Sequence, residues 1–164
     1  MDRIAALASA MIDYEEGNPG RICHFLKVHG YARAIGGLEG LRVEEMEILE
    51  AAALTHDIGI KPSEEKYGSG DGKYQELEGP PVAKPMLEGL GFSPDLVQRV
   101  CWLIGHHHTY DAIEGMDYQI LVEADFLVNL DEGKSSPEAI RSVREKIFRT
   151  EAGRRFLARL FPEA

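Results

Sequence analysis

The stretch from Ala51 to Gly59 places two ionisable side chains at the end of an apolar helical run, Ala-Ala-Ala-Leu-Thr-His-Asp-Ile-Gly. A helical period of 3.6 residues carries the apolar face of this run onto His56 and Asp57. An aspartate in the last turn of a helix also lies at the unfavourable end of the helix dipole. We therefore expect a positive group beside Asp57, either a basic side chain or a cation.

Three more ionisable residues, His24, His107 and Asp125, each fall on the apolar face of a different expected helix. Taken singly, a histidine on such a face is more often a hydrogen-bonded core residue, and Asp125 could pair with an arginine. Taken together with His56 and Asp57 they favour a shared metal ion, because burying an unpaired carboxylate costs roughly several kcal/mol. Imidazole and carboxylate ligands suit Fe, Mn, Co, Ni or Zn better than Ca or Mg.

Amphipathic periodicity predicts helices throughout the chain and no strand, hence an all-α fold. The expected helices span about 1–16, 21–35, 43–58, 80–90, 95–107, 118–130 and 136–148, followed by a short amphipathic segment near 156–161. The polar, glycine-rich segment 61–73 is expected to be a loop. We predict one domain over 1–164 with seven to eight helices, a core at about 20–130 and C-terminal helices at 136–162 packed on it.

The charge of the chain excludes some classes of partner. A formal net charge of −10 without a basic stripe argues against general nucleic-acid binding and against binding to anionic membranes. It does not exclude a phosphate substrate, because a bound metal supplies local positive charge. No run approaches the ~20 apolar residues of a membrane span. The start of the chain lacks a signal-peptide pattern, so a cytoplasmic location is expected.

The spacing of His24, His56-Asp57 and Asp125 resembles the H…HD…D signature of the HD-domain metal-dependent phosphohydrolases. The flanking residues from Arg21 to His24 and from Glu123 to Leu127 agree, and the resemblance covers about 20–130. It implies an all-helical HD-domain fold and a metal held by those four residues. It also implies hydrolysis of a nucleotide or another small phosphate ester or phosphoanhydride by a metal-activated water, as a phosphomonoesterase or a phosphodiesterase or pyrophosphohydrolase.

Members of this group with two metals carry further ligands between the HD pair and the last aspartate. The Ile-Gly-His-His-His run at 104–108 is similar to one such element and selects His107 and His108, although a shift of one residue would select His106. A position usually held by histidine before a glycine is occupied by Glu78, which either ligates the second metal or favours a helix N-terminus. The resemblance implies that Asp57 bridges the metals and is the central catalytic residue.

Other features of the resemblance leave the details open. In members with two metals, a lysine directly follows the glycine that corresponds to Gly59. Here Ile60 follows Gly59 and the lysine, Lys61, comes one residue later, so Lys61 is the candidate for binding the substrate phosphate. We expect one or two divalent transition metals per chain and a small-molecule phosphate, with a nucleotide as the first expectation. The alternatives are a non-catalytic metal- or nucleotide-binding sensor or interaction module, and a di-iron oxygenase on the same fold. No motif in the sequence identifies the substrate or an oligomeric state.

Overall fold

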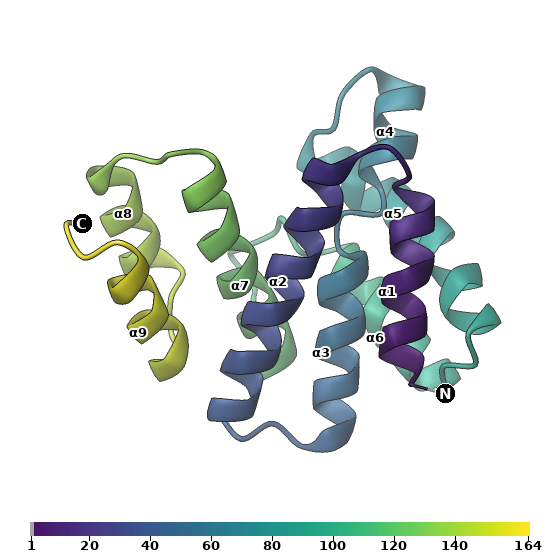
Figure 1. The fold of residues 1–164 in the computed structure, drawn as a ribbon, viewed down its shortest axis with the longest axis horizontal. Coiled ribbons are helices and arrows are strands. Elements are labelled where there is room, and N and C mark those ends of the chain that lie inside the picture. Colours follow the sequence, from purple (N-terminus) through teal and green to yellow (C-terminus); the bar gives the residue numbers. More distant parts are fainter. Residues whose placement is uncertain (1) are drawn as a thin grey trace.

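Helix α3 lies at the centre of the molecule, and its residues from Leu49 to Thr55 are all buried. The computed structural model describes residues 2–164, and over those residues it consists of nine helices without a strand, which confirms the predicted all-α fold (Figure 1). The helices are α1 (Arg3–Tyr14), α2 (Pro19–Leu38), α3 (Val43–Thr55), α4 (Ile60–Tyr67), α5 (Gly72–Gly89), α6 (Pro94–Ile104), α7 (Met116–Glu132), α8 (Pro137–Lys146) and α9 (Glu151–Leu160).

The packing around α3 brings distant parts of the sequence together. Helix α3 contacts α1, α2, α6 and α7, and α2 also packs along α7. Helices α8 and α9 lie beyond α7, at the left of Figure 1, and α9 contacts both α7 and α2. The ends of α3 and α6, the second half of α7 and the first half of α2 therefore meet in one region. The predicted metal ligands lie on or just beyond these helices, except Glu78, which lies on α5.

Several helix starts follow directly from local sequence. The side chains of Ser93 and Ser136 each accept a hydrogen bond from the backbone N–H three residues on, and a proline follows each serine at the first helical position. Asn18 caps α2 in the same manner, again before a proline. These caps confirm the starts predicted near 94 and 137, because a serine–proline pair satisfies a free N–H and presets the backbone at once.

The prediction of a loop over 61–73 is wrong. Helix α4 occupies Ile60–Tyr67, and α5 begins at Gly72 instead of near Pro80 or Pro81. Helix α4 has no apolar periodicity that would predict a helix, because it is short and largely exposed, with only Ser63 buried. The first half of helix α5 was not predicted because its buried residues are mostly small or polar. They lie four apart, namely Gln75, Gly79, Ala83 and Leu87, and only Leu87 is a large apolar residue.

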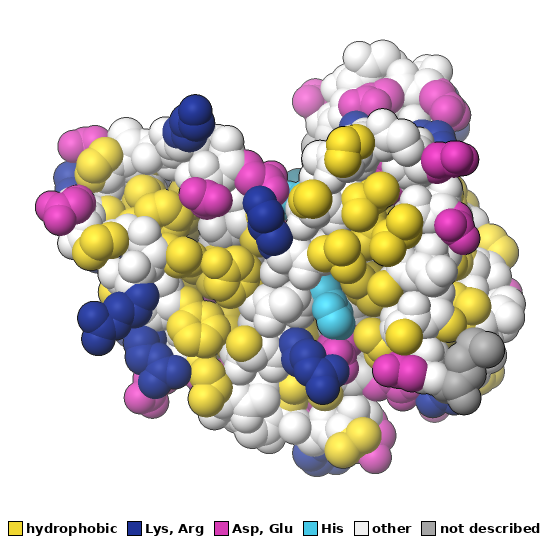
Figure 2. All heavy atoms as spheres, in the orientation of Figure 1, with side chains coloured by type: hydrophobic (Ala, Val, Ile, Leu, Met, Phe, Trp, Pro, Cys, Tyr) yellow, Lys and Arg dark blue, Asp and Glu magenta, His cyan; other side chains and the backbone are white. Residues whose placement is uncertain are grey.

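Apolar side chains gather at the surface between α2 and α9. Figure 2 shows hydrophobic side chains over these helices with basic side chains beside them. Tyr31, Phe156 and Leu160 line a shallow groove of about 520 Å³ there, together with Lys27 and Arg159. None of the helices within residues 2–164 combines the length and apolarity needed to cross a membrane.

Candidate metal centre

Helices α3 and α6 are each followed by a histidine that hydrogen-bonds to a carbonyl oxygen at the helix C-terminus. His56 follows the last residue of α3 and donates its Nδ1–H to the carbonyl oxygen of Ala53 over 2.8 Å. His107 lies three residues beyond α6 and donates its Nδ1–H to the carbonyl oxygen of Ile104, also over 2.8 Å. Carbonyl groups at a helix C-terminus lack partners within the helix, so each histidine satisfies one of them. In both rings the Nε2 atom is left to point into the interior.

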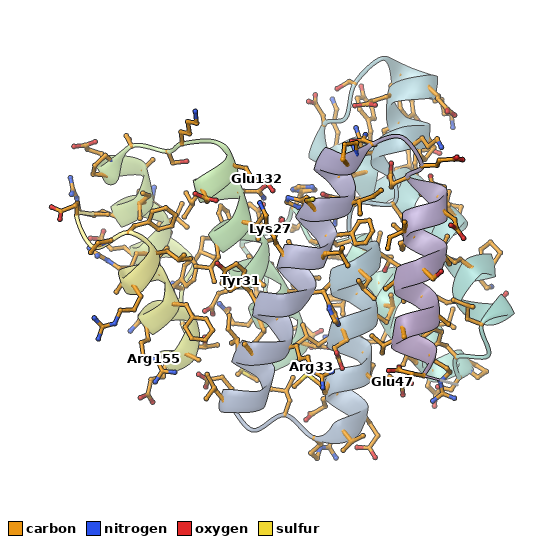
Figure 3. All side chains as sticks on the ribbon, in the orientation of Figure 1. Lys27, Tyr31, Arg33, Glu47, Glu132 and Arg155 are labelled. Atoms are coloured by element: carbon orange, nitrogen blue, oxygen red, sulfur yellow. The ribbon has the colours of Figure 1, made fainter. Side chains whose placement is uncertain are left out.

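His24 is oriented by a carboxylate instead of a carbonyl group. Its Nδ1 atom lies 3.0 Å from Oε2 of Glu132, at the end of α7. Figure 3 shows Glu132 facing Lys27 of α2, and Lys27 Nζ lies 3.6 Å from the other carboxylate oxygen. No local pattern in the sequence marks Glu132, because only the packing of α2 along α7 brings it to His24. Imidazoles that bind metals typically donate their other N–H to a carboxylate or carbonyl group in this way.

Four of the predicted ligands converge on one point. His24 Nε2 lies 3.2 Å from Asp57 Oδ2 and 3.2 Å from Asp125 Oδ1. His56 Nε2 lies 3.3 Å from the same two oxygens. The two Nε2 atoms are themselves 3.3 Å apart. The structure thus brings together the residues of the H…HD…D pattern, from α2, the end of α3 and α7.

The second oxygen of Asp57 faces a different histidine. His107 Nε2 lies 3.5 Å from Asp57 Oδ1. This nitrogen is fully buried and forms no hydrogen bond with the described residues. A buried polar atom without a partner is rare and costly, so it needs an explanation. A cation beside Asp57 Oδ1 would supply the missing partner.

Without a cation, protons must balance the buried charge of the cluster. Burial opposes ionisation of His24, but its hydrogen bonds to Asp125 and Asp57 prevail and raise its pKa to about 10. Despite complete burial, the charges of Asp57 and Asp125 also raise the pKa of His56. Burial works against ionisation of the two carboxyl groups as well, yet the neighbouring imidazoles hold the pKa of Asp57 and of Asp125 well below the usual range.

These protons are a poor substitute for a metal. Two imidazole Nε2 atoms at 3.3 Å cannot both donate to one another, and two imidazolium charges at that separation repel. A single divalent cation would accept lone pairs from both imidazoles and from both carboxylates at the same time. Two groups of potential ligands share Asp57, one with His24 and His56 and the other with His107 and His108. The residues present therefore fit one or two divalent metals of the predicted kinds.

His108 belongs to the second group, and α5 fixes its position. Its ring packs against that of His107, with centroids 4.0 Å apart, and its backbone N–H donates to Glu76 Oε1 over 3.0 Å. The Nε2 atom lies 3.0 Å from Gln75 Oε1. Burial and the neighbouring His107 lower the pKa of His108 to about 4, so its imidazole is neutral at pH 7 and has a lone pair available.

Three other candidates lie apart from the cluster. The carboxylate of Glu78 accepts hydrogen bonds from Tyr67 Oη over 2.7 Å and from Lys66 Nζ over 3.0 Å, so the structure does not bring it to His107 and His108. Lys61 Nζ donates to the backbone oxygen of Tyr14 over 3.1 Å. His106 donates Nδ1–H to the carbonyl oxygen of Trp102 and stacks on the Trp102 ring, away from Asp57.

A pocket of about 850 Å³ opens beside the cluster between α2 and α7. Residues of the cluster, His24 and Asp57, form part of its lining, and two basic residues, Arg21 and Lys27, form another part. Asn129 also lines it and donates to Asp125 Oδ1 over 3.0 Å. These basic residues and Asn129 were not among the predicted site residues, although Arg21 and Lys27 lie three residues to either side of His24 along α2.

Comparisons with known proteins agree with this geometry. The family model described as HD domain matches residues 21–149. No curated protein matches the sequence. The fold is similar to that of a crystal structure from an uncultured Thermotogales bacterium, described as a predicted HD superfamily hydrolase. The TM-score is 0.69 and the identity 24%, over 96% of this chain and 84% of that one. The family model covers well over half of the sequence, including His24, His56, Asp57 and Asp125, and the chain therefore belongs to the HD domain family.

Proposed function

We propose that the protein is a metal-dependent phosphohydrolase that acts on a nucleotide or another small phosphate ester or phosphoanhydride. One observation carries this proposal. The two oxygens of Asp57 face two separate groups of imidazole nitrogens, His24 and His56 on one side and His107 on the other. A carboxylate placed in this manner is suited to bridge two cations, an arrangement that recurs in enzymes that hydrolyse phosphate esters.

A bound divalent cation supplies Lewis acidity and lowers the pKa of a coordinated water to about 7. The protein contributes orientation. The carbonyl oxygens of Ala53 and Ile104 hold His56 and His107 with Nε2 inward, and Asn129 holds one oxygen of Asp125. Because these groups are fixed before substrate binds, they need little reorganisation during the reaction.

Arg21 and Lys27 are suited to bind the phosphate oxygens of the substrate. Both line the pocket beside Asp57, and each is paired at present with a carboxylate near the surface. Arg21 Nη2 lies 2.8 Å from Glu64 Oε1, and Lys27 Nζ lies 3.6 Å from Glu132 Oε1. Exposed pairs of this kind contribute little to stability, so a phosphate group is able to displace them. Lys61, directed towards the backbone of Tyr14, is a weaker candidate.

The proposal is tested by changing Asp57→Ala in the metal-reconstituted protein. We expect hydrolysis of p-nitrophenyl phosphate and of a panel of nucleotides and dinucleoside polyphosphates by the wild type. In the variant, hydrolysis should fall to background and metal per chain, measured by elemental analysis, should fall with it. Asp13→Ala, an exposed position on α1, serves as the matched control and should retain both. Retained hydrolysis in Asp57→Ala would overturn the assignment.

The same preparation separates the two alternative functions. A di-iron oxygenase would consume oxygen with its substrate and show a mixed-valent iron signal after anaerobic reduction. A sensor or interaction module would bind metal and nucleotide and leave the nucleotide unchanged. Either result, with no phosphate release from any compound in the panel, contradicts the proposed hydrolysis.

A further inference from the structure

The amide group of Gln75 is held in one orientation. Its Nε2 atom donates to the backbone oxygen of Gly70 over 2.7 Å. A carbonyl oxygen only accepts hydrogen bonds, so the amide nitrogen must be the atom that faces Gly70. The amide oxygen Oε1 consequently points the other way, towards His108. Gln75 is also buried, with 7% of its surface exposed, so this orientation does not arise from contact with solvent.

The Oε1 atom of Gln75 extends the second group of candidate ligands. It accepts a hydrogen bond from Nε2–H of His108 over 3.0 Å, where a cation would take the place of the proton, and His108 groups with Asp57 and His107. Donor atoms that share one cation, with bonds of about 2.0–2.2 Å at nearly right angles, lie roughly 3 Å apart. The His24 and His56 nitrogens at the first position show a comparable separation of 3.3 Å. The Gln75–His108 pair therefore has the spacing of two ligands of one ion.

The residues around this pair hold it in place. A Cβ atom at Gly72 would lie 2.8 Å from Cγ of His108, so the first turn of α5 passes directly against the imidazole. Glu76 anchors the backbone N–H of His108 and the hydroxyl group of Thr109. Glu78, by contrast, is engaged by Tyr67 and Lys66.

We propose that Gln75 Oε1, and not the Glu78 carboxylate, is the ligand that α5 contributes to a second metal position with Asp57, His107 and His108. This inference rests on the proposed metal site and names the chemistry of its second half. An amide oxygen is a neutral, hard ligand and binds cations more weakly than a carboxylate does. The second position therefore holds its ion less tightly than the first, and favours a hard cation such as Mn²⁺.

The test is a titration of the metal-stripped full chain with Mn²⁺, in which EPR measures both the free ion and the spin coupling between two bound ions. The wild type should bind a first equivalent tightly and a second one more weakly, and the coupled signal should grow with the second. Gln75→Met, which keeps the length of the side chain without the oxygen, should lose the second equivalent and the coupling while the first equivalent stays.

The isosteric change Gln75→Glu should have the opposite effect on the affinity for the second Mn²⁺. A carboxylate bound directly to the cation should tighten the second equivalent by about tenfold or more, since it adds a negative charge to the ligand set. The control changes Gln98→Met and Gln98→Glu, at an exposed position of α6, should alter neither equivalent. The wild-type titration and the Gln75→Glu variant keep the test decisive if Gln75→Met folds poorly.

The outcomes separate this inference from the proposed function. If both Gln75 variants bind the second equivalent as the wild type does, or if the wild type shows no second equivalent, the assignment of Gln75 is wrong while hydrolysis at the first position is untouched. If metal binds as described but no phosphate ester is hydrolysed, the proposed function fails and the Gln75 assignment stands. Failure to bind any Mn²⁺ overturns both.

Discussion

At the scale of single residues, the candidate centre depends on which nitrogen of each imidazole is left for the metal. Backbone carbonyl oxygens at the ends of α3 and α6 engage Nδ1 of His56 and His107, and Glu132 engages Nδ1 of His24. Each engagement leaves Nε2 directed at Asp57. The partner of the outer nitrogen thus sets the orientation and basicity of the ligand.

Removal of the Glu132 side chain should therefore weaken the first metal position without removing a ligand. We expect Glu132→Ala to lower the affinity for Co²⁺ by about 10–100-fold, the usual effect of losing such a partner. Isothermal titration calorimetry measures the affinity, and Asp131→Ala, an exposed acidic neighbour, is the matched control. Equal affinities in Glu132→Ala and wild type would show that the contact with His24 Nδ1 does not influence the metal.

At the scale of helices, two glycines set how closely α5 approaches the HD pair. A Cβ atom at Gly59 would lie 2.5 Å from the backbone oxygen of Gln75 and 2.8 Å from the nitrogen of Gly79. A Cβ atom at Gly79 would lie 2.5 Å from Cγ2 of Ile104. Backbone therefore packs on backbone here, which fixes the rotation of α5 and directs Gln75 towards His108.

Enlarging this contact should destabilise the fold, because no flexible side chain is available to move aside. We expect Gly59→Ala to cost about 1–3 kcal/mol of the free energy of unfolding, as overpacking does. Gly30→Ala is the matched control, since a Cβ atom there meets nothing within 4 Å in the exposed middle of α2, and it should stabilise by about 0.4–1 kcal/mol. Urea denaturation measures both, and a neutral Gly59→Ala would contradict the close approach.

At the scale of the whole molecule, an acidic chain of net charge −10 places two carboxylates side by side within a helical fold, Asp125 buried and Asp57 partly buried. In the absence of metal, protonated imidazoles balance them, and metal binding must displace those protons. The pKa of His24 is raised from 6.5 to about 10, whereas the pKa values of Asp57 and Asp125 are lowered. As the pH rises and His24 loses its proton, the stability of the metal-free protein should therefore fall while the metal affinity grows.

The sign of the linkage gives a definite pH profile for the metal-free protein. The raised pKa of His24 stabilises the metal-free fold. This stabilisation is fully present below about pH 6.5 and is lost as the pH rises towards 10. The lowered aspartate pKa values stabilise above about pH 4 and lose their effect in acid. With EDTA, we expect the melting temperature to fall between pH 6.5 and 10. With saturating Mn²⁺ this fall should be absent, since metal affinity grows as His24 loses its proton. Parallel curves in both conditions would contradict the linkage.

The amino-acid sequence was sufficient to predict the helical fold and to identify His24, His56, Asp57 and Asp125 as candidate metal ligands. It could do so because helical periodicity is local, so a polar residue on an apolar face is visible without knowledge of the partner helix. The resemblance to the HD-domain family then implied metal-dependent phosphate hydrolysis at these residues. The starts of α6 and α8 were equally local, since each is a serine followed by a proline.

Two parts of the site depend on tertiary structure, namely the contribution of α5 and the contact of Glu132 with His24. Helix α5 buries a stripe of small and polar residues four apart, and the pairing of glycines at 59 and 79 sets its rotation. That rotation turns Gln75 to His108 and leaves Glu78 to Lys66 and Tyr67. Likewise, the packing of α7 on α2 brings Glu132 to His24 across 108 residues. Such contacts depend on how two helix surfaces meet, and no local pattern within either segment specifies that meeting.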